Sequence, residues 1–236
     1  MATQVCREVV RRIIAGHFPE GQFIDDENRL CDRFNVSKSV VREAIKILVS
    51  KGLLEVRRGN GTKVKPRSSW NLLDDDVLAW HLGTDPKPDF LKKLIDIRLM
   101  IEPNAAYWAA STASSSQIDE IRNSHNDMEK ATNIQEFVIA DAKFHRAVLR
   151  AANNELLTSM DGVIFSALLT SIKITNNDPI DNRTRSLPLH LKILRSIEMH
   201  DKEGAQMAMR GHLADTYDRL SILLPELNLE TKAYGT

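Results

Sequence analysis

The most constraining feature of this chain is that only one short stretch predicts paired β-strands. Residues 54–58 and 62–65 flank Gly59-Asn60-Gly61, which is a strong hairpin-turn signal. Every other periodic segment repeats its apolar residues at helical spacing. We therefore expect a mainly α-helical protein with a single β-hairpin.

Three helical patterns precede this hairpin, over residues 3–15, 26–34 and 38–50. Asn35-Val36-Ser37 predicts a tight turn between the second and the third, with Ser37 as an N-cap. The third helix has an apolar stripe on one face and Lys38, Arg42 and Lys46 on another. A short helix, a tight turn and a basic helix are typical of a helix-turn-helix that enters the major groove of DNA. The alternative for the basic stripe is a solvated charged face.

The charge distribution favours DNA as a partner of the first part of the chain. Residues 1–67 hold 14 Lys and Arg against 8 Asp and Glu, whereas the remainder holds 18 against 24. A basic hairpin next to a helix-turn-helix is suited to contact phosphates or the minor groove as a wing. The two cysteines, Cys6 and Cys31, predict no disulfide framework, and no signal peptide or membrane span is evident. We therefore expect a cytoplasmic protein.

From Leu73 onward the sequence shows only helical patterns, which predicts an all-α bundle of six or seven helices. They cover residues 76–82, 87–111, 116–131, 134–152, 154–174, 188–200 and 201–224. The predicted organisation is a winged helix-turn-helix at residues 1–67, a linker at 68–75, an all-helical domain at 76–228 and a tail at 229–236.

Four residues of this second domain have the spacing of ligands to one metal ion. Asp141 and His145 stand one helical turn apart on the same face. His190 and His212 lie about ten residues on either side of a predicted helix–helix turn, so antiparallel helices would bring both imidazoles to the same depth. Each histidine taken alone has a structural or surface role as its alternative.

The motifs of the first domain resemble the winged helix of GntR-family bacterial transcription regulators. They are Pro19-x-Gly21, Glu27-x-x-Leu30, Val36-Ser37-Lys38-x-x-Val41-Arg42-Glu43-Ala44, Gly52-Leu53 and Gly59-x-Gly61-Thr62-x-Val64. The resemblance implies DNA contacts from Lys38, Ser39 and Arg42 and from Arg58 and Gly59 at the wing tip. Lys38 stands where the family usually has arginine, and lysine lacks the fork that pairs with guanine. The operator sequence therefore cannot be carried over from the family.

The second domain resembles the FCD-type effector domain of the FadR subfamily, in its metal-binding branch. The resemblance rests on Arg98-x-x-x-Glu102, Asp141-x-x-x-His145 and Asn154-x-x-Leu157. It implies that Asp141, His145, His190 and His212 bind a divalent ion. We expect zinc first, with nickel, manganese or iron also compatible with these donors. It also implies that Arg98 and Asn154 contact the effector, although Arg98 could instead pair with Glu102, and Asn154 could cap a helix.

Residues 70–80, at the junction, are similar to those of regulators of sugar-acid catabolism, namely galactonate-type repressors. We therefore expect a homodimeric repressor, not an enzyme, that binds double-stranded operator DNA and is released by a sugar acid such as an aldonate. The alternative is an effector of the lactate, glycolate or citrate type with a purely structural metal. A remote alternative is a metal-dependent hydrolase, since such a donor set could activate water.

Overall fold

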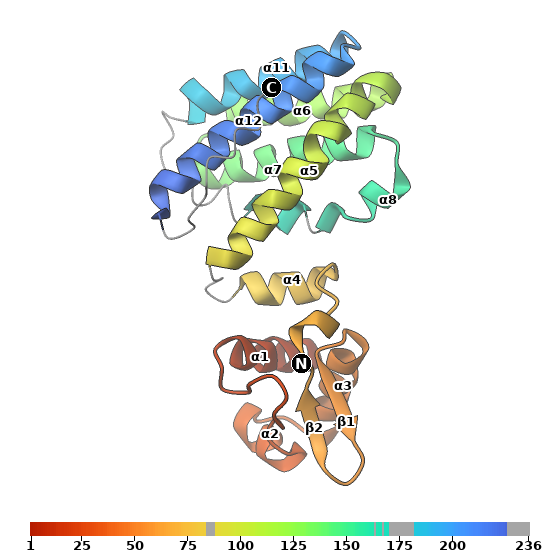
Figure 1. The fold of residues 1–236 in the computed structure, drawn as a ribbon, viewed down its shortest axis with the longest axis vertical. Coiled ribbons are helices and arrows are strands. Elements are labelled where there is room, and N and C mark those ends of the chain that lie inside the picture. Colours follow the sequence, from red (N-terminus) through yellow and green to blue (C-terminus); the bar gives the residue numbers. More distant parts are fainter. Residues whose placement is uncertain (84–87, 163, 167, 170–181, 226–236) are drawn as a thin grey trace. The chain divides into compact units, whose positions relative to one another are not determined.

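The computed structural model describes residues 1–83, 88–162, 164–166, 168–169 and 182–225 (Figure 1). The chain divides into two compact units, residues 1–86 and 87–236. Each unit has its own hydrophobic core. The expected fold class is confirmed, because a winged helix-turn-helix is followed by a helical domain. The tail expected at residues 229–236 lies outside the described residues.

The first unit begins with helices α1 (Ala2–Ile14), α2 (Glu27–Phe34) and α3 (Lys38–Ser50). Asp26 is the N-cap of α2, where its carboxylate accepts a hydrogen bond from the backbone N–H of Arg29 at 3.0 Å. Asn35 ends α2 in the left-handed region, with φ of 50°, which asparagine tolerates better than most residues. This reversal starts the tight turn into α3.

The wing is an antiparallel hairpin of β1 (Leu54–Arg57) and β2 (Gly61–Val64). Its register pairs Leu54 with Val64 and Arg57 with Gly61. Gly59 and Gly61 have φ of 79° and 105°, which explains why the turn requires glycine. Phe23 forms an isolated antiparallel bridge to Lys63, so the segment before α2 flanks the wing.

Helix α4 (Asp75–Leu82), which follows the short turn η1 (Arg67–Ser69), packs into the core of the first unit. Val77 and Trp80 of α4 are buried with apolar residues of α1 and α3. Nζ of Lys51, at the end of α3, lies 2.6 Å from a carboxylate oxygen of Asp74. Asp74 in turn accepts a hydrogen bond from the N–H of Val77 in the first turn of α4. These contacts hold α4 against the end of α3.

The second unit is a helical bundle (Figure 1). Its described elements are α5 (Pro88–Thr112), α6 (Ser115–Lys130), α7 (Ile134–Ala151), α8 (Glu155–Thr158), η2 (Asn182–Ser186), α11 (Leu187–Glu198) and α12 (Lys202–Leu223). Helices α5, α6, α7, α11 and α12 share one hydrophobic cluster, and smaller clusters join α5 to α7 and to α12. Side-chain caps start three of these helices: Ser114 and Gln117 form a capping box on α6, Asn133 caps α7, and Asp201 caps α12.

The single helix expected over residues 154–174 is interrupted, because α8 ends at Thr158. The N–H of Met160 bonds to the carbonyl of Leu157, and the turn at residues 159–160 precedes further helical residues up to 169. Positions 163, 167 and 170–174 of that expectation lie outside the described residues. Among the helices that the structure does describe, none is both long and apolar enough to cross a membrane.

Candidate functional site

Helix α7 supplies two polar side chains to the centre of the second unit, Asp141 and His145. One helical turn separates them, so both leave the same face of α7, and both are buried. Oδ1 of Asp141 lies 3.3 Å from Nε2 of His145. The rest of this face is apolar, with Phe144 and Val148 in the surrounding core.

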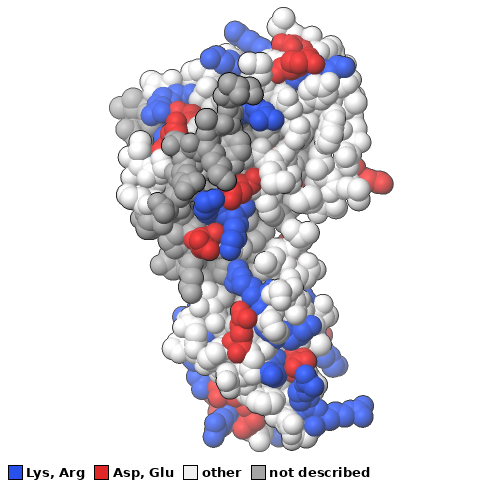
Figure 2. Space-filling view, viewed as in Figure 1, with Lys and Arg blue, Asp and Glu red and all other residues white. Residues whose placement is uncertain are grey.

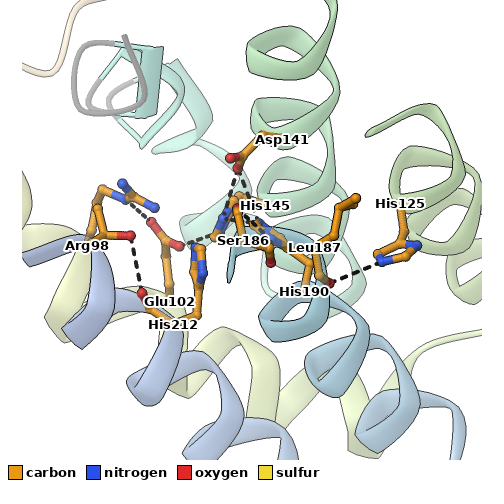
Figure 3. A network of polar contacts seen from close by, with 10 residues as sticks. Arg98, Glu102, His125, Asp141, His145, Ser186, Leu187, His190 and His212 are labelled. Carbon is orange, nitrogen blue, oxygen red and sulfur yellow. Dashed lines mark hydrogen bonds and ion pairs between the residues drawn. The ribbon is translucent and has the colours of Figure 1, made fainter. Parts of the chain in front are cut away.

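Helices α11 and α12 bring His190 and His212 to the same place (Figure 3). His190 lies in the first turn of α11, and His212 lies near the middle of α12. The ring centroid of His212 is 4.2 Å from that of His190 and 5.1 Å from that of His145. The three histidines each offer one ring nitrogen, and these nitrogens lie within 4.8 Å of one another. Asp141 completes the group, because its Oδ1 is 3.3 Å from Nε2 of His190.

A second layer of acceptors sets which nitrogen of two rings carries the proton. Nδ1 of His190 donates to the backbone carbonyl of Ser186 at 2.8 Å. Nδ1 of His145 faces Oε2 of Glu102 at 2.6 Å. Because a carbonyl or a carboxylate only accepts, each Nδ1 is the protonated atom and each Nε2 carries the lone pair of the neutral ring.

The donor set therefore fits a metal ion. Nε2 of His145 and Nε2 of His190 are 3.2 Å apart, and Oδ1 of Asp141 is 3.3 Å from both. Three acceptor atoms at these distances repel one another unless a cation or a proton lies between them. Ligands held tetrahedrally at about 2.0–2.1 Å from zinc are roughly 3.3 Å apart. The observed spacing has this size.

The electrostatics of the cluster also favour a cation. Burial would raise the pKa of Asp141, but the nearby His190 and His145 hold the pKa well below its usual value. Two effects lower the pKa of His212 well below its usual value. The larger is burial, and the other is the positive charge that His190 and His145 can carry, so His212 stays neutral. Burial would lower the pKa of His145, but Glu102 and Asp141 outweigh it and raise that pKa. Because Nδ1 of His145 carries the proton of the neutral ring, the second proton that makes the ring cationic lies on Nε2, the atom that would bind a metal.

Glu102 is a residue of this site whose role the sequence analysis missed. It is 2 % exposed, and its Oε1 accepts a hydrogen bond from Nε of Arg98 at 2.6 Å while Oε2 faces His145. Burial opposes its ionisation, yet Arg98 and His145 lower its pKa to about 2. The available signal was an Arg–Glu pair one turn apart in an otherwise apolar part of α5.

The two residues expected at an effector both make contacts that the sequence analysis left open as alternatives. Arg98 is 2 % exposed and forms the ion pair with Glu102. Oδ1 of Asn154 accepts hydrogen bonds from the backbone N–H groups of Leu156 and Leu157, so Asn154 caps α8. A further buried cation, Arg219, lies two turns after His212 in α12 and pairs with Asp215. Its burial was not evident from the sequence.

Two other histidines, His125 and His200, make structural contacts with backbone carbonyls. Nε2 of the buried His125 lies 3.4 Å from the carbonyl oxygen of Leu187. Nδ1 of His200 donates to the carbonyl of Ala110 at 3.0 Å, and its φ of 56° forms the turn between α11 and α12. Neither belongs to the cluster.

The residues expected to contact DNA all lie on the surface of the first unit. Lys38, Ser39 and Arg42 are exposed on the first half of α3, and Arg58 and Gly59 are exposed at the wing turn. Lys and Arg side chains are prominent around this unit, in the lower part of Figure 2, with Asp and Glu side chains among them. The arrangement presents a recognition helix and a basic wing on one folded unit.

Comparisons with known proteins agree with both halves of this description. Residues 1–64 match the family described as bacterial regulatory proteins, gntR family, and residues 93–215 match the FCD domain. The galactonate operon transcriptional repressor of Escherichia coli K12 is 31 % identical over 89 % of this chain and 92 % of its own length. The Glc operon transcriptional activator of the same organism is 25 % identical over 89 % of this chain and 84 % of its own length.

The fold is similar to the solved structure of Lar, which controls expression of the Listeria monocytogenes agr system. The TM-score is 0.63 at 17 % identity, and the match covers 94 % of this chain and 97 % of that one.

Proposed function

We propose that this chain, which belongs to the GntR family of bacterial regulatory proteins and carries an FCD domain, represses a sugar-acid catabolic operon. In this proposal, a carboxylate metabolite releases it from DNA. Family membership makes it a DNA-binding transcriptional regulator and not an enzyme. We also propose which effector and which metal the protein binds, and that it forms a homodimer.

The observation that carries the proposal is the convergence of three acceptor atoms within 3.2–3.3 Å in a buried site. We propose that Asp141, His145, His190 and His212 hold a divalent ion, with zinc first. When bound, this ion would supply a Lewis acid with coordination positions that a ligand carboxylate and hydroxyl can occupy. Glu102 and the carbonyl of Ser186 hold the rings of His145 and His190 in the tautomer that such binding needs.

Arg98 is the proposed cation for the effector carboxylate. A guanidinium has five N–H donors, so one side chain can serve both Glu102 and a ligand. Asn154 would contribute its amide nitrogen, because its amide oxygen caps α8. An aldonate offers one carboxylate and several hydroxyls and suits this combination. Lactate-, glycolate- and citrate-type acids are the alternatives.

Measuring the metal content of the protein tests whether these residues bind an ion or form only a cluster of buried histidines. We expect the dialysed wild-type protein to retain one zinc ion per chain and the His190→Ala variant to lose it. The matched control is His125→Gln, which changes another buried histidine of the same bundle that lies outside the cluster. Elemental analysis makes the measurement. Zinc retained by His190→Ala at the wild-type level contradicts the proposed site.

The effector is tested on DNA binding by the zinc-loaded protein. We expect D-galactonate or a related aldonate to weaken binding to an operator at least tenfold, because the ligand must prefer one arrangement of the regulator in order to shift it. Gel shifts with aldonates, lactate, glycolate and citrate make the comparison. If none of these acids changes the affinity, the carboxylate effector is wrong. Equal effector affinity with and without zinc would make the metal purely structural.

A further inference from the structure

Arg42, on the recognition helix α3, is held by a carboxylate of the preceding helix. Nε of Arg42 lies 3.1 Å from Oε1 and 3.0 Å from Oε2 of Glu27, the first residue of α2. Both side chains reach solvent, with 62 % of Arg42 and 39 % of Glu27 exposed. The pair therefore lies on the surface and not in the core.

The other cations expected to contact DNA are not held in this way. Within the described part of the chain, Lys38 and Arg58 form no ion pair. Lys46, one turn after Arg42, lies 3.9 Å from Glu43, at the limit of an ion pair. Arg42 thus combines two close contacts to a carboxylate with a place on the first half of the recognition helix.

The geometry of the guanidinium limits what this arginine can do. Glu27 takes up the Nε donor, while the terminal nitrogens of Arg42 belong to a side chain that is mostly exposed. Two terminal N–H donors form a fork that matches the O6 and N7 acceptors of guanine. The negative charge of Glu27 offsets the positive charge of Arg42, which reduces the attraction of the pair to a phosphate. The fork of terminal N–H groups stays available for an uncharged base edge.

We propose that Glu27 is a positioning residue for DNA recognition. It orients Arg42 so that its terminal nitrogens read a base edge in the major groove, and it weakens the binding of the same arginine to the phosphates of unrelated DNA. The start of α2 is suited to this role, because a carboxylate in the first turn of a helix is stabilised by the helix dipole. Glu27 would thereby increase specificity without contacting DNA itself.

The Glu27→Gln variant tests this proposal. The DNA probes are a duplex selected by the wild-type protein from a random library and a scrambled duplex of the same length. We expect the variant to bind the scrambled duplex several-fold more tightly and the selected duplex no more tightly. The ratio of the two affinities should fall about tenfold, and the slope of log K against log salt should become steeper by up to about 0.9. Fluorescence anisotropy at several salt concentrations gives both quantities.

Two further variants separate positioning from charge and from folding. Glu43→Gln removes the same charge from α3 without touching Arg42, so it should change both affinities alike and keep the ratio. Glu27→Asp keeps the charge but shortens the side chain, which moves the carboxylate away from Arg42. It should therefore lower the ratio of the two DNA affinities and leave the salt slope at its wild-type value. An unchanged ratio in Glu27→Asp, or equal ratios in Glu27→Gln and Glu43→Gln, overturns the proposal. Far-ultraviolet circular dichroism checks that each variant is folded.

Discussion

At the scale of single residues, the protonation of His145 would link pH to the proposed metal binding. Its pKa is raised above 6.5, because Glu102 and Asp141 outweigh the effect of burial. In the metal-free protein, the stability that this proton contributes is complete below about pH 6.5 and is lost as the pH rises through the raised pKa. A bound metal ion would take the place of the proton, so the two compete.

We therefore expect zinc to raise the Tm of the second unit more at pH 8 than at pH 6. The Tm increase caused by zinc should be larger at pH 8 than at pH 6 by about 2–4 °C for each kcal/mol of stability that is lost when His145 loses its proton. Thermal unfolding of the chelator-treated protein with and without zinc measures it, with magnesium as the control ion, since magnesium prefers oxygen ligands. A zinc-induced shift that is equal at both pH values, or larger at pH 6, contradicts the competition.

At the scale of elements, α12 contains two glycines in different surroundings. A Cβ at Gly211 would meet no atom within 4 Å, whereas a Cβ at Gly204 would lie 1.9 Å from Oδ2 of the N-cap Asp201. We expect Gly211→Ala to raise the free energy of unfolding by about 0.5–1 kcal/mol, because alanine favours the helix. Gly204→Ala should gain nothing or lose stability, because the displaced cap is worth about 1 kcal/mol. Urea unfolding measures the free energy of unfolding of both variants, and equal changes in the two would contradict this prediction.

At the scale of the whole molecule, the two units have separate cores, and all four proposed metal ligands belong to the second. Trp70 and Trp80 lie in the first unit and Trp108 in the second. In the Trp108→Phe variant, the two remaining tryptophans report only the first unit. We expect the thermal unfolding transition followed by their fluorescence to be unaffected by zinc. The helical circular dichroism of the same variant should show a transition that zinc moves to higher temperature. Equal zinc shifts in both signals would show that the chain unfolds as one unit.

Local features of the fold could be predicted from short stretches of sequence. Gly59-Asn60-Gly61 predicts the wing, because its turn needs positive φ, and the structure shows these values at Gly59 and Gly61. The winged helix and the helical second domain are confirmed. The single helix expected over residues 154–174 is wrong in its extent, because α8 ends at Thr158 and a turn follows at residues 159–160.

The candidate site shows where sequence reasoning ends. The spacing of Asp141 and His145 places them on one face of α7, but the alternatives for Arg98 and Asn154 could not be separated. The structure shows the ion pair of Arg98 and the helix cap of Asn154, while their effector roles stay predictions. Glu102 was seen only as a neighbour of Arg98, since nothing in its own helix indicates that His145 of another helix lies 2.6 Å away.

The sequence by itself determined what depends on neighbours along the chain, namely the helix faces, the wing turn and the spacing of candidate ligands. The tertiary structure decided which side chains meet and what charge they carry. The packing of α5, α7, α11 and α12 brings two carboxylates, one guanidinium and three imidazoles into a buried space. The pKa shifts of Glu102, Asp141, His145 and His212 follow from burial and from distances through space, and neither quantity is a function of separation along the chain.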